Sequence, residues 1–267
     1  MKIPEIRSEA VEVWDGRAKI GVQIAGSGPP IVYLHPAAGL AWDPFLFRLA
    51  ERRTVYAPEF PGTSAVDRQA IYAIDDVWDA VLVYEEALRK LGLERPTIIG
   101  QSFGGMLAAE IASTFPSLVS KLVLLDPAGL WRDDAPVFNW MTSLPAELMG
   151  RLFHDPTCAG AQAMFTPPAD PDQAIAGQAS FVWAIGCTGK LLWPIPDKGL
   201  AKRLHRVKAP TLVIWGENDG LIPSVYAEDF GKRIAGSKVA IIPNCGHIPQ
   251  LEKTEETWAH VAPFLGL

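Results

Sequence analysis

The stretch Thr97–Met106, with the sequence TIIGQSFGGM, places one serine between glycines directly after a short apolar run. Ser102 is the centre of a Gly-x-Ser-x-Gly pattern whose outer positions are Gly100 and Gly104. A serine flanked in this way forms a tight turn or presents a nucleophile. Because a β-branched run precedes it and the helical pattern GGMLAAEIASTF follows it, we expect Ser102 at a strand-to-helix turn, where the pattern displays a nucleophile.

Short apolar runs rich in β-branched residues recur along the chain. Besides the run before Ser102, they are PPIVYLHP, RTVYAPEF, KLVLLDPAG, PTLVIWGEND and KVAIIPNCGH. Their continuous apolar character is typical of parallel strands that are buried on both faces. Most are separated by helical patterns, namely IDDVWDAVLVYEEALRKLGL, GGMLAAEIASTF, SVYAEDFGKRI and EETWAHVAPFL. The alternation predicts an open α/β fold, with a mostly parallel, twisted sheet between helices. Before it, AVEVWDG and RAKIGVQIAGSG predict a hairpin joined by an Asp-Gly turn.

The segment over residues 130–199 breaks this alternation. It is rich in proline and tryptophan and shows short helical patterns without a convincing buried strand. We therefore expect a core domain formed by residues 1–129 and 200–267, and a helical cap over residues 130–199 that folds over the edge of the sheet. The cap tryptophans serve either as packing between cap and core or as the lining of an apolar pocket. They are Trp131, Trp140, Trp183 and Trp193.

Composition limits the partners that this chain can have. The 267 residues carry a formal net charge of -6, spread along the sequence, which argues against nucleic acid and anionic membrane surfaces and favours a small molecule. The three cysteines lack a metal-type spacing and a disulfide framework, which fits a reducing compartment. The N-terminal stretch MKIPEIRSEAVEVWDG lacks the apolar segment of a signal peptide, and no run approaches transmembrane length. We expect a cytoplasmic protein, as a monomer or a homodimer.

Polar residues follow the predicted strands at their carboxyl ends. In an open α/β sheet, ligands bind beyond these ends, where the connecting loops meet. A serine, two candidate acids and a histidine are the components of an activated nucleophile. The residues in these positions are His35 with Pro36, Glu59, Ser102, Asp126, Asp219 and His247.

With these residues the chain resembles the α/β-hydrolase family over almost its whole length. The resemblance is carried by LHPAAG, APEFPGTS, GQSFGG, WGENDGLIP and NCGHIPQLE, which follow the third, fourth, fifth, seventh and eighth predicted strands. The order Ser102, Asp219, His247 is that family's chain order of nucleophile, acid and base. The resemblance implies an α/β-hydrolase fold with a helical cap after the sixth strand, and a serine hydrolase that needs neither cofactor nor metal.

Each catalytic role has a chemical reason. The Ser102 hydroxyl is too weak a nucleophile to attack a carbonyl carbon unless a base takes its proton, and His247 is the predicted base. Asp219 would orient His247 and stabilise the imidazolium. Asp126 is the rival acid, because it also follows a strand and some family members place their acid there. Asp219 is favoured because GENDGLIP has the family's aspartate-to-proline spacing.

The predicted oxyanion hole departs from the family pattern. Similar proteins commonly have His-Gly after the third strand, whereas this chain has HPAAG over residues 35–39. Pro36 has no N–H and cannot donate. The backbone N–H groups of Ala37 and Phe103 are therefore the two predicted donors, and His35 is predicted to make structural hydrogen bonds.

The substrate is predicted less directly. An apolar, aromatic cap favours an uncharged acyl or aryl ester, so carboxylester hydrolysis comes first. Carbon–carbon hydrolysis of meta-ring-fission products is the alternative, although Ile248 stands where similar enzymes have tryptophan and Arg132 and Arg151 are the only candidates for binding a carboxylate in the cap. A small-molecule receptor on the same fold is the third possibility. The candidate pocket residues are His35, Trp131, Trp140, Trp183 and Ile248.

Overall fold

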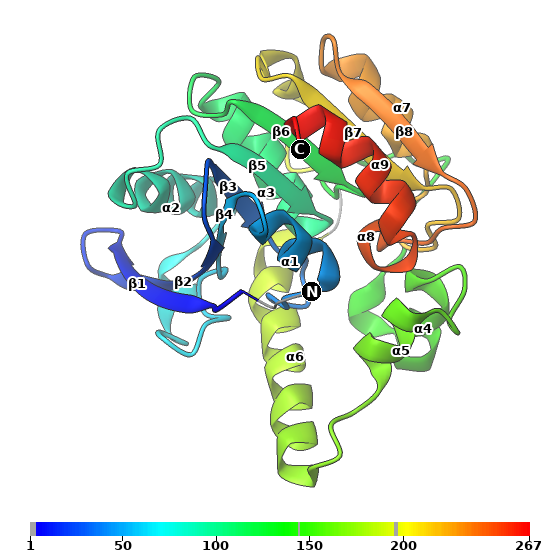
Figure 1. Cartoon of the computed structure of the whole chain (residues 1–267), viewed down its shortest axis with the longest axis horizontal. Helices are drawn as coiled ribbons and strands as arrows, with labels where there is room; N and C mark the ends of the chain where they lie inside the picture. Colours follow the sequence, from blue (N-terminus) through cyan, green and yellow to red (C-terminus); the bar gives the residue numbers. More distant parts are fainter. Residues whose placement is uncertain (1–3, 144, 195–196) are drawn as a thin grey trace.

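The computed structural model of the chain describes residues 4–143, 145–194 and 197–267, and it confirms the α/β fold (Figure 1). The described strands form one sheet in the order β1-β2-β4-β3-β5-β6-β7-β8. The β1–β2 and β2–β4 pairs are antiparallel and the other pairs are parallel. The strands are β1 (Arg7–Val13), β2 (Ala18–Gly26), β3 (Pro30–Leu34), β4 (Thr54–Pro58), β5 (Thr97–Gln101), β6 (Lys121–Leu125), β7 (Thr211–Gly216) and β8 (Lys238–Ile242).

Helices cover both faces of this sheet, as predicted (Figure 1). The α-helices are α1 (Pro44–Ala50), α2 (Val77–Lys90), α3 (Phe103–Thr114), α4 (Pro145–Leu152), α5 (Ala159–Phe165), α6 (Pro171–Leu192), α7 (Val225–Arg233), α8 (Pro249–Glu252) and α9 (Thr254–Leu265). The 3-10 helices are η1 (Ala70–Ala73), η2 (Trp140–Thr142), η3 (Leu200–Lys202) and η4 (Leu204–Arg206). None of the helices in the described part of the chain is long and apolar enough to cross a membrane.

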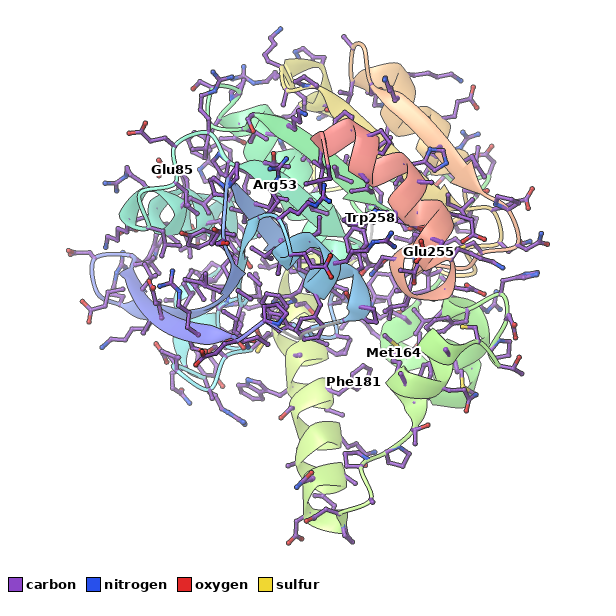
Figure 2. All side chains as sticks on the ribbon, in the orientation of Figure 1. Arg53, Glu85, Met164, Phe181, Glu255 and Trp258 are labelled. Carbon is purple, nitrogen blue, oxygen red and sulfur yellow. The ribbon has the colours of Figure 1, made fainter. Side chains whose placement is uncertain are left out.

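The continuous apolar runs divide between two cores because successive strand residues point to opposite faces. On β6, Leu122 and Leu124 pack in the core that also contains α2, α3 and α7. Val123 and Leu125 pack in the second core, under α1 and α9. In that core, Trp258 of α9, labelled in Figure 2, meets Phe45 of α1 edge to face at 5.9 Å.

Three local expectations need correction. β8 is an edge strand, with Val239 and Ile241 44% and 43% exposed, so it is not buried on both faces as predicted. The hairpin connection spans four residues, Trp14 to Arg17, so it is longer than an Asp-Gly turn alone. The short helix α1 was not predicted; Asp43 caps it by accepting the Leu46 N–H at 2.8 Å.

The segment between β6 and β7 is helical, and the described residues in it form no strand. The expectation of only short helices is wrong for α6, which has 22 residues. It starts at an Asp170 cap followed by Pro171, and no charged residue occurs over 173–189. Figure 1 shows α6 extending away from the sheet, so only part of the segment lies over the sheet edge.

Side-chain contacts attach the C-terminal half of α6 to the core, including an ion pair of Lys190 with Asp75 at 3.4 Å. Trp183 Nε1 donates to the Gly62 carbonyl at 2.7 Å, and Thr188 Oγ1 donates to the Ala37 carbonyl at 3.1 Å. The residues of α6 before Trp183 are nearly all exposed. The domain bounds at 129–130 and 199–200 stay predictions, and residues 144, 195 and 196 of the predicted cap lie outside the described residues.

Two glycine substitutions test how closely the start of α3 packs against the end of β3. A Cβ at Gly104 would collide with the Leu34 carbonyl oxygen, whereas a Cβ at Gly177, within α6, meets nothing within 4 Å. We expect Gly104→Ala to lower the free energy of unfolding by about 3 kcal/mol or more, because backbone cannot move aside. Gly177→Ala, the matched control, should raise it by about 0.5–1 kcal/mol. Thermal denaturation monitored by circular dichroism measures the stability of both variants. Equal midpoints for the two variants would contradict the close packing of α3 against β3.

Candidate active site

Ser102 lies at the sharp turn between β5 and α3. Its backbone has φ 53° and ψ -116°, a conformation that costs about 1–3 kcal/mol for a residue with a side chain. Three hydrogen bonds hold this conformation: Ser102 N–H donates to the Leu125 carbonyl at 2.9 Å, and the Ser102 carbonyl accepts from Met106 and Ala128 at 3.0 Å each. A Cβ at Gly100 would strike the Gly104 carbonyl, so the elbow closes only with glycine there.

The structure brings the three predicted catalytic side chains together. His247 Nε2 lies 2.9 Å from Ser102 Oγ, and His247 Nδ1 lies 2.7 Å from Asp219 Oδ2. The loops after β5, β7 and β8 supply the three residues. Ser102, Asp219 and His247 are 7%, 8% and 2% exposed. The arrangement allows a proton to pass from Ser102 Oγ to Nε2 while Nδ1–H donates to the carboxylate.

Four N–H donors fix the Asp219 carboxylate. Oδ1 accepts from the backbone N–H groups of Leu221 and Ile222 at 2.8 and 2.9 Å. Oδ2 accepts from Trp215 Nε1 at 3.1 Å and from His247. The aspartate-to-proline spacing predicted the acid, but the Trp215 donor was missed because a strand tryptophan gives no sign of where its N–H points.

Asp126, the rival acid, lies beside this pair but is not bonded to His247. Its carboxyl is fully buried, and Oδ1 accepts the Gly216 N–H at 2.8 Å. Burial raises the pKa of Asp126 well above its usual range, and the nearby Asp219 carboxylate raises it further. The bond to Nδ1 is made by Asp219, so the geometry favours Asp219 as the partner of the histidine.

Asp126, Asp219 and His247 offer ligand atoms within 4.8 Å of one another, so we asked whether they fit a cation. Both Asp219 oxygens already accept hydrogen bonds from N–H groups. His247 Nδ1 is within hydrogen-bond distance of the same carboxylate. The donor set therefore fits a histidine–aspartate pair better than a metal site.

The last turn of α4 joins the acid loop to the base loop. His247 N–H donates to the Leu152 carbonyl at 2.7 Å, and Gly220 N–H donates to the Arg151 carbonyl at 3.2 Å. Glu252 of α8 adds a second tie, because its oxygens accept from Gly246 and Asp155 N–H at 2.6 Å each. Sequence reasoning quoted Glu252 at the end of NCGHIPQLE but gave it no role.

The predicted oxyanion donors sit on two adjoining loops. In the described residues, neither the Ala37 nor the Phe103 N–H makes a hydrogen bond to protein. Gly39 N–H donates to the Pro36 carbonyl at 3.1 Å, which closes the turn around Ala37. Because Phe103 is the first residue of α3, its N–H is one of the free donors at the positive end of that helix.

His35 supports this loop. Its Nδ1–H donates to the Pro36 carbonyl at 2.7 Å, and its Nε2 accepts the Phe60 N–H at 2.8 Å. Burial lowers the pKa of His35 to about 4. The neutral ring therefore makes hydrogen bonds of the structural kind that was predicted, and substrate contact by His35 stays a prediction.

The other candidate pocket residues occupy different places. Trp183 lines a groove of about 700 Å³ between η1 and α6, together with Ile71, Tyr72 and Val182. Trp140 lines a cavity of about 10 Å³ beside Met106. The remaining candidates differ: Trp131 is partly exposed and donates to Asp133, Trp193 is 52% exposed, and Ile248 packs with Phe153 and Ala161 under α4 and α5. Substrate contact stays a prediction for all of them.

Comparison with known proteins agrees with this fold. The profile of the Alpha/beta hydrolase family matches residues 31–260, and the chain belongs to that family. The chain is thus a hydrolase of the α/β-hydrolase fold, and its curated relatives include both esterases and carbon–carbon bond hydrolases.

Three relatives illustrate the range. The chain is 25% identical to a 2-hydroxy-6-oxo-6-phenylhexa-2,4-dienoate hydrolase of Burkholderia cepacia, over 89% of this chain and 87% of that one. It is 26% identical to a pimeloyl-[acyl-carrier protein] methyl ester esterase of Nitrosomonas europaea, over 90% and 96%. The crystal structure of a membrane phospholipase A, a bacterial virulence factor, superposes with a TM-score of 0.79 at 25% identity, covering 98% and 86%.

The pKa of His35 makes stability depend on pH. The folded-state pKa of His35, about 4, lies below the ordinary 6.5. The contribution of the neutral His35 ring to the free energy of unfolding is therefore present above pH 6.5 and is lost as the pH falls through 4. We expect the wild type to lose about 3 kcal/mol more than His35→Gln between these limits. Urea denaturation of the wild type and of His35→Gln at pH 4, 5, 6 and 7 measures this difference in stability. Parallel curves for the two proteins would show that His35 is protonated equally in both states.

Proposed function

We propose that this protein is a serine hydrolase that cleaves a small, largely apolar carboxylic ester through an acyl-enzyme intermediate. The observation that carries the proposal is the buried hydrogen-bonded chain from Ser102 through His247 to Asp219. A serine hydroxyl on a strained elbow, within 2.9 Å of an imidazole nitrogen, is arranged for attack on a carbonyl carbon.

The proposed reaction has two half-reactions. Ser102 Oγ attacks the ester carbonyl while His247 Nε2 takes its proton, and Asp219 stabilises the resulting imidazolium. The negative oxygen of the tetrahedral intermediate accepts hydrogen bonds from the Ala37 and Phe103 N–H groups. His247 then gives its proton to the departing alkoxide, which leaves as the alcohol. A water, deprotonated by His247, releases the acid from Ser102 in the same way.

The composition of the cap favours an apolar substrate. Figure 2 labels Met164 near the end of α5 and Phe181 in the middle of α6, and these side chains are 43% and 41% exposed. No charged residue occurs on α6 over 173–189. Two of the relatives above are named as a methyl ester esterase and a phospholipase, which supports carboxylester chemistry on this scaffold.

Carbon–carbon hydrolysis by the same three residues is the second candidate, supported by the relative named as a dienoate hydrolase. The dienoate has a carboxylate, which calls for a cation in the site. Arg132 is paired with Asp134 and Asp229, and Arg151 is exposed and stacks over Phe138 at 4.4 Å. Because neither arginine is buried and free, we place ester hydrolysis first. A receptor is the third candidate, distinguished by the absence of turnover.

The proposal includes a cytoplasmic location, a small-molecule substrate as the partner, no cofactor, and no role for nucleic acid or membrane. The cysteines support a reducing compartment, because Cys158, Cys187 and Cys245 are all free.

Ser102→Ala tests the nucleophile. We expect it to abolish labelling by a fluorophosphonate and to lower kcat for p-nitrophenyl butyrate by about 10⁴-fold or more, because the acyl-enzyme cannot form. Ser120→Ala, a surface-loop control, should keep both. Labelling that persists in Ser102→Ala would place the nucleophile at another residue.

A substrate panel decides between the candidate functions. We would compare p-nitrophenyl esters of increasing chain length, a thioester and a ring-fission dienoate by kcat/KM. Preference for the esters supports the first candidate, preference for the dienoate supports the second, and single-turnover acylation without release supports a receptor.

Ala37→Pro tests the oxyanion loop. The substitution deletes the Ala37 N–H, so kcat should fall about 100-fold while KM changes little, because the bond forms mainly in the transition state. Ala37→Gly keeps the N–H and should stay within about fivefold of the wild type. Circular dichroism confirms folding. A folded Ala37→Pro protein with near-full kcat would exclude Ala37 as a donor.

A further inference from the structure

Asp126 places a second buried carboxyl beside the Asp219–His247 pair. One oxygen atom of Asp126 and one of Asp219 lie within 4.8 Å of each other and of a His247 ring nitrogen. Oδ1 of Asp126 accepts the Gly216 N–H at 2.8 Å. Oδ2 is buried, and among the described residues it has no hydrogen-bond partner. The proposed mechanism uses neither oxygen.

The charges around Asp126 do not stabilise a second anion. Asp219 and Glu252 are carboxyl groups, and both raise the pKa of Asp126. Cys245 lies on the neighbouring loop, and burial, the largest cause, raises the pKa of its thiol. The nearest cation that could form is an imidazolium at His247, which is already bonded to Asp219. An ionised Asp126 would thus be a buried carboxylate with one donor and no counter-ion.

A proton on Oδ2 removes this difficulty. The neutral acid is a donor, and Asp219 is the neighbouring acceptor, so the orphan oxygen gains a partner and the pair carries one negative charge. The direction of the Asp126 pKa agrees, because burial and the nearby charge of Asp219 both favour the protonated form.

We propose that Asp126 is a positioning residue that stays a neutral carboxylic acid in the folded protein, with Oδ1 accepting the Gly216 N–H and Oδ2–H donating to Asp219. It ties the end of β6 to the end of β7 and holds the Asp219 carboxylate toward His247. The stability consequences follow from the buried acid alone. The kinetic consequences rest on the proposed function.

The first test is the pH dependence of stability in Asp126→Asn. The amide has the shape of the neutral acid and can make the same two bonds, but it cannot ionise. A raised folded-state pKa means that wild-type stability falls as the pH rises above the ordinary carboxyl range toward the folded pKa. We therefore expect the variant's melting temperature to exceed that of the wild type by an amount that grows to several degrees between pH 4 and pH 8. A difference that does not grow with pH would overturn the proposal.

Asp155→Asn is the matched control. Hydrogen bonds from Thr157 lower the pKa of Asp155, so its contribution to stability is already present at pH 4, and the melting temperature of this variant should differ from that of the wild type by an amount that stays constant between pH 4 and pH 8. If Asp126→Asn does not fold, the wild type is measured directly. At pH 7.5, where Asp43 with a pKa of about 6 has ionised, carbon-13 spectra of aspartate-labelled protein should keep one protonated carboxyl. A spectrum with none would overturn the proposal.

The second test is kinetic. Asp126→Asn should shift the acid limb of the kcat/KM profile by less than about 0.3 pH units, since it removes no charge. If Asp126 were ionised, the loss of a negative charge about 5 Å from His247 would move that limb by about 2 pH units toward lower pH, which would overturn the proposal. Asp126→Leu, which deletes both bonds, should lower kcat about tenfold with little change in KM. Equal kcat for the leucine and asparagine variants would deny a positioning role.

The two proposals fail separately. If Ser102→Ala keeps its activity, the proposed function is wrong, but the melting and carbon-13 results for Asp126 are unaffected. If the melting difference does not grow with pH while Ser102→Ala is inactive, the function stands and the neutral acid does not.

Discussion

The close approach of α3 to β3 and β5 at the Ser102 turn is the constraint on which the rest of the site depends. Gly100 and Gly104 bring backbone against backbone, so that the helix begins one residue after Ser102, directly at the end of a central strand. The turn then has no freedom to relax, and the serine is held at positive φ. With the nucleophile fixed, the acid and the base have one place to meet it, above the ends of β7 and β8.

The cap is part of this site through its backbone. Carbonyl groups at the end of α4 accept N–H bonds from both the acid loop and the base loop, and Thr188 of α6 bonds to the carbonyl of Ala37. The two halves of the cap therefore touch different halves of the machinery: α4 with α5 touches the proton-transfer side, and α6 touches the loop of the oxyanion donors. The α4 contacts use backbone atoms and therefore constrain side-chain identity very little, whereas the α6 contact requires the hydroxyl of Thr188.

The sequence predicted the central sheet well, and the three residues that it proposes as catalytic lie together in the structure, because continuous β-branched runs and the Gly-x-Ser-x-Gly pattern have few alternative structures. The exposure of β8 was not predicted, because an apolar run in the sequence does not show whether its strand has neighbours on both sides in the sheet. Helix α1, with seven residues, is too short for a helical period to show. The length of α6 was not predicted, because its glycines weaken the helical pattern and its uncharged stretch has no polar, charged face to mark a helical period. The occupied nitrogens of His35 and the orphan oxygen of Asp126 depend on packing between distant segments, which no local pattern contains.

The outer half of α6 has a consequence for how such a protein changes over generations. Its residues before Trp183 are almost all exposed and make few contacts with the core. Replacements there carry little penalty in folding and do not disturb the serine, the histidine or the two carboxyl groups. Substitutions can therefore accumulate along this helix without altering the residues gathered around Ser102. A chain divided in this way can vary its outer surface while one inherited set of site residues stays unchanged.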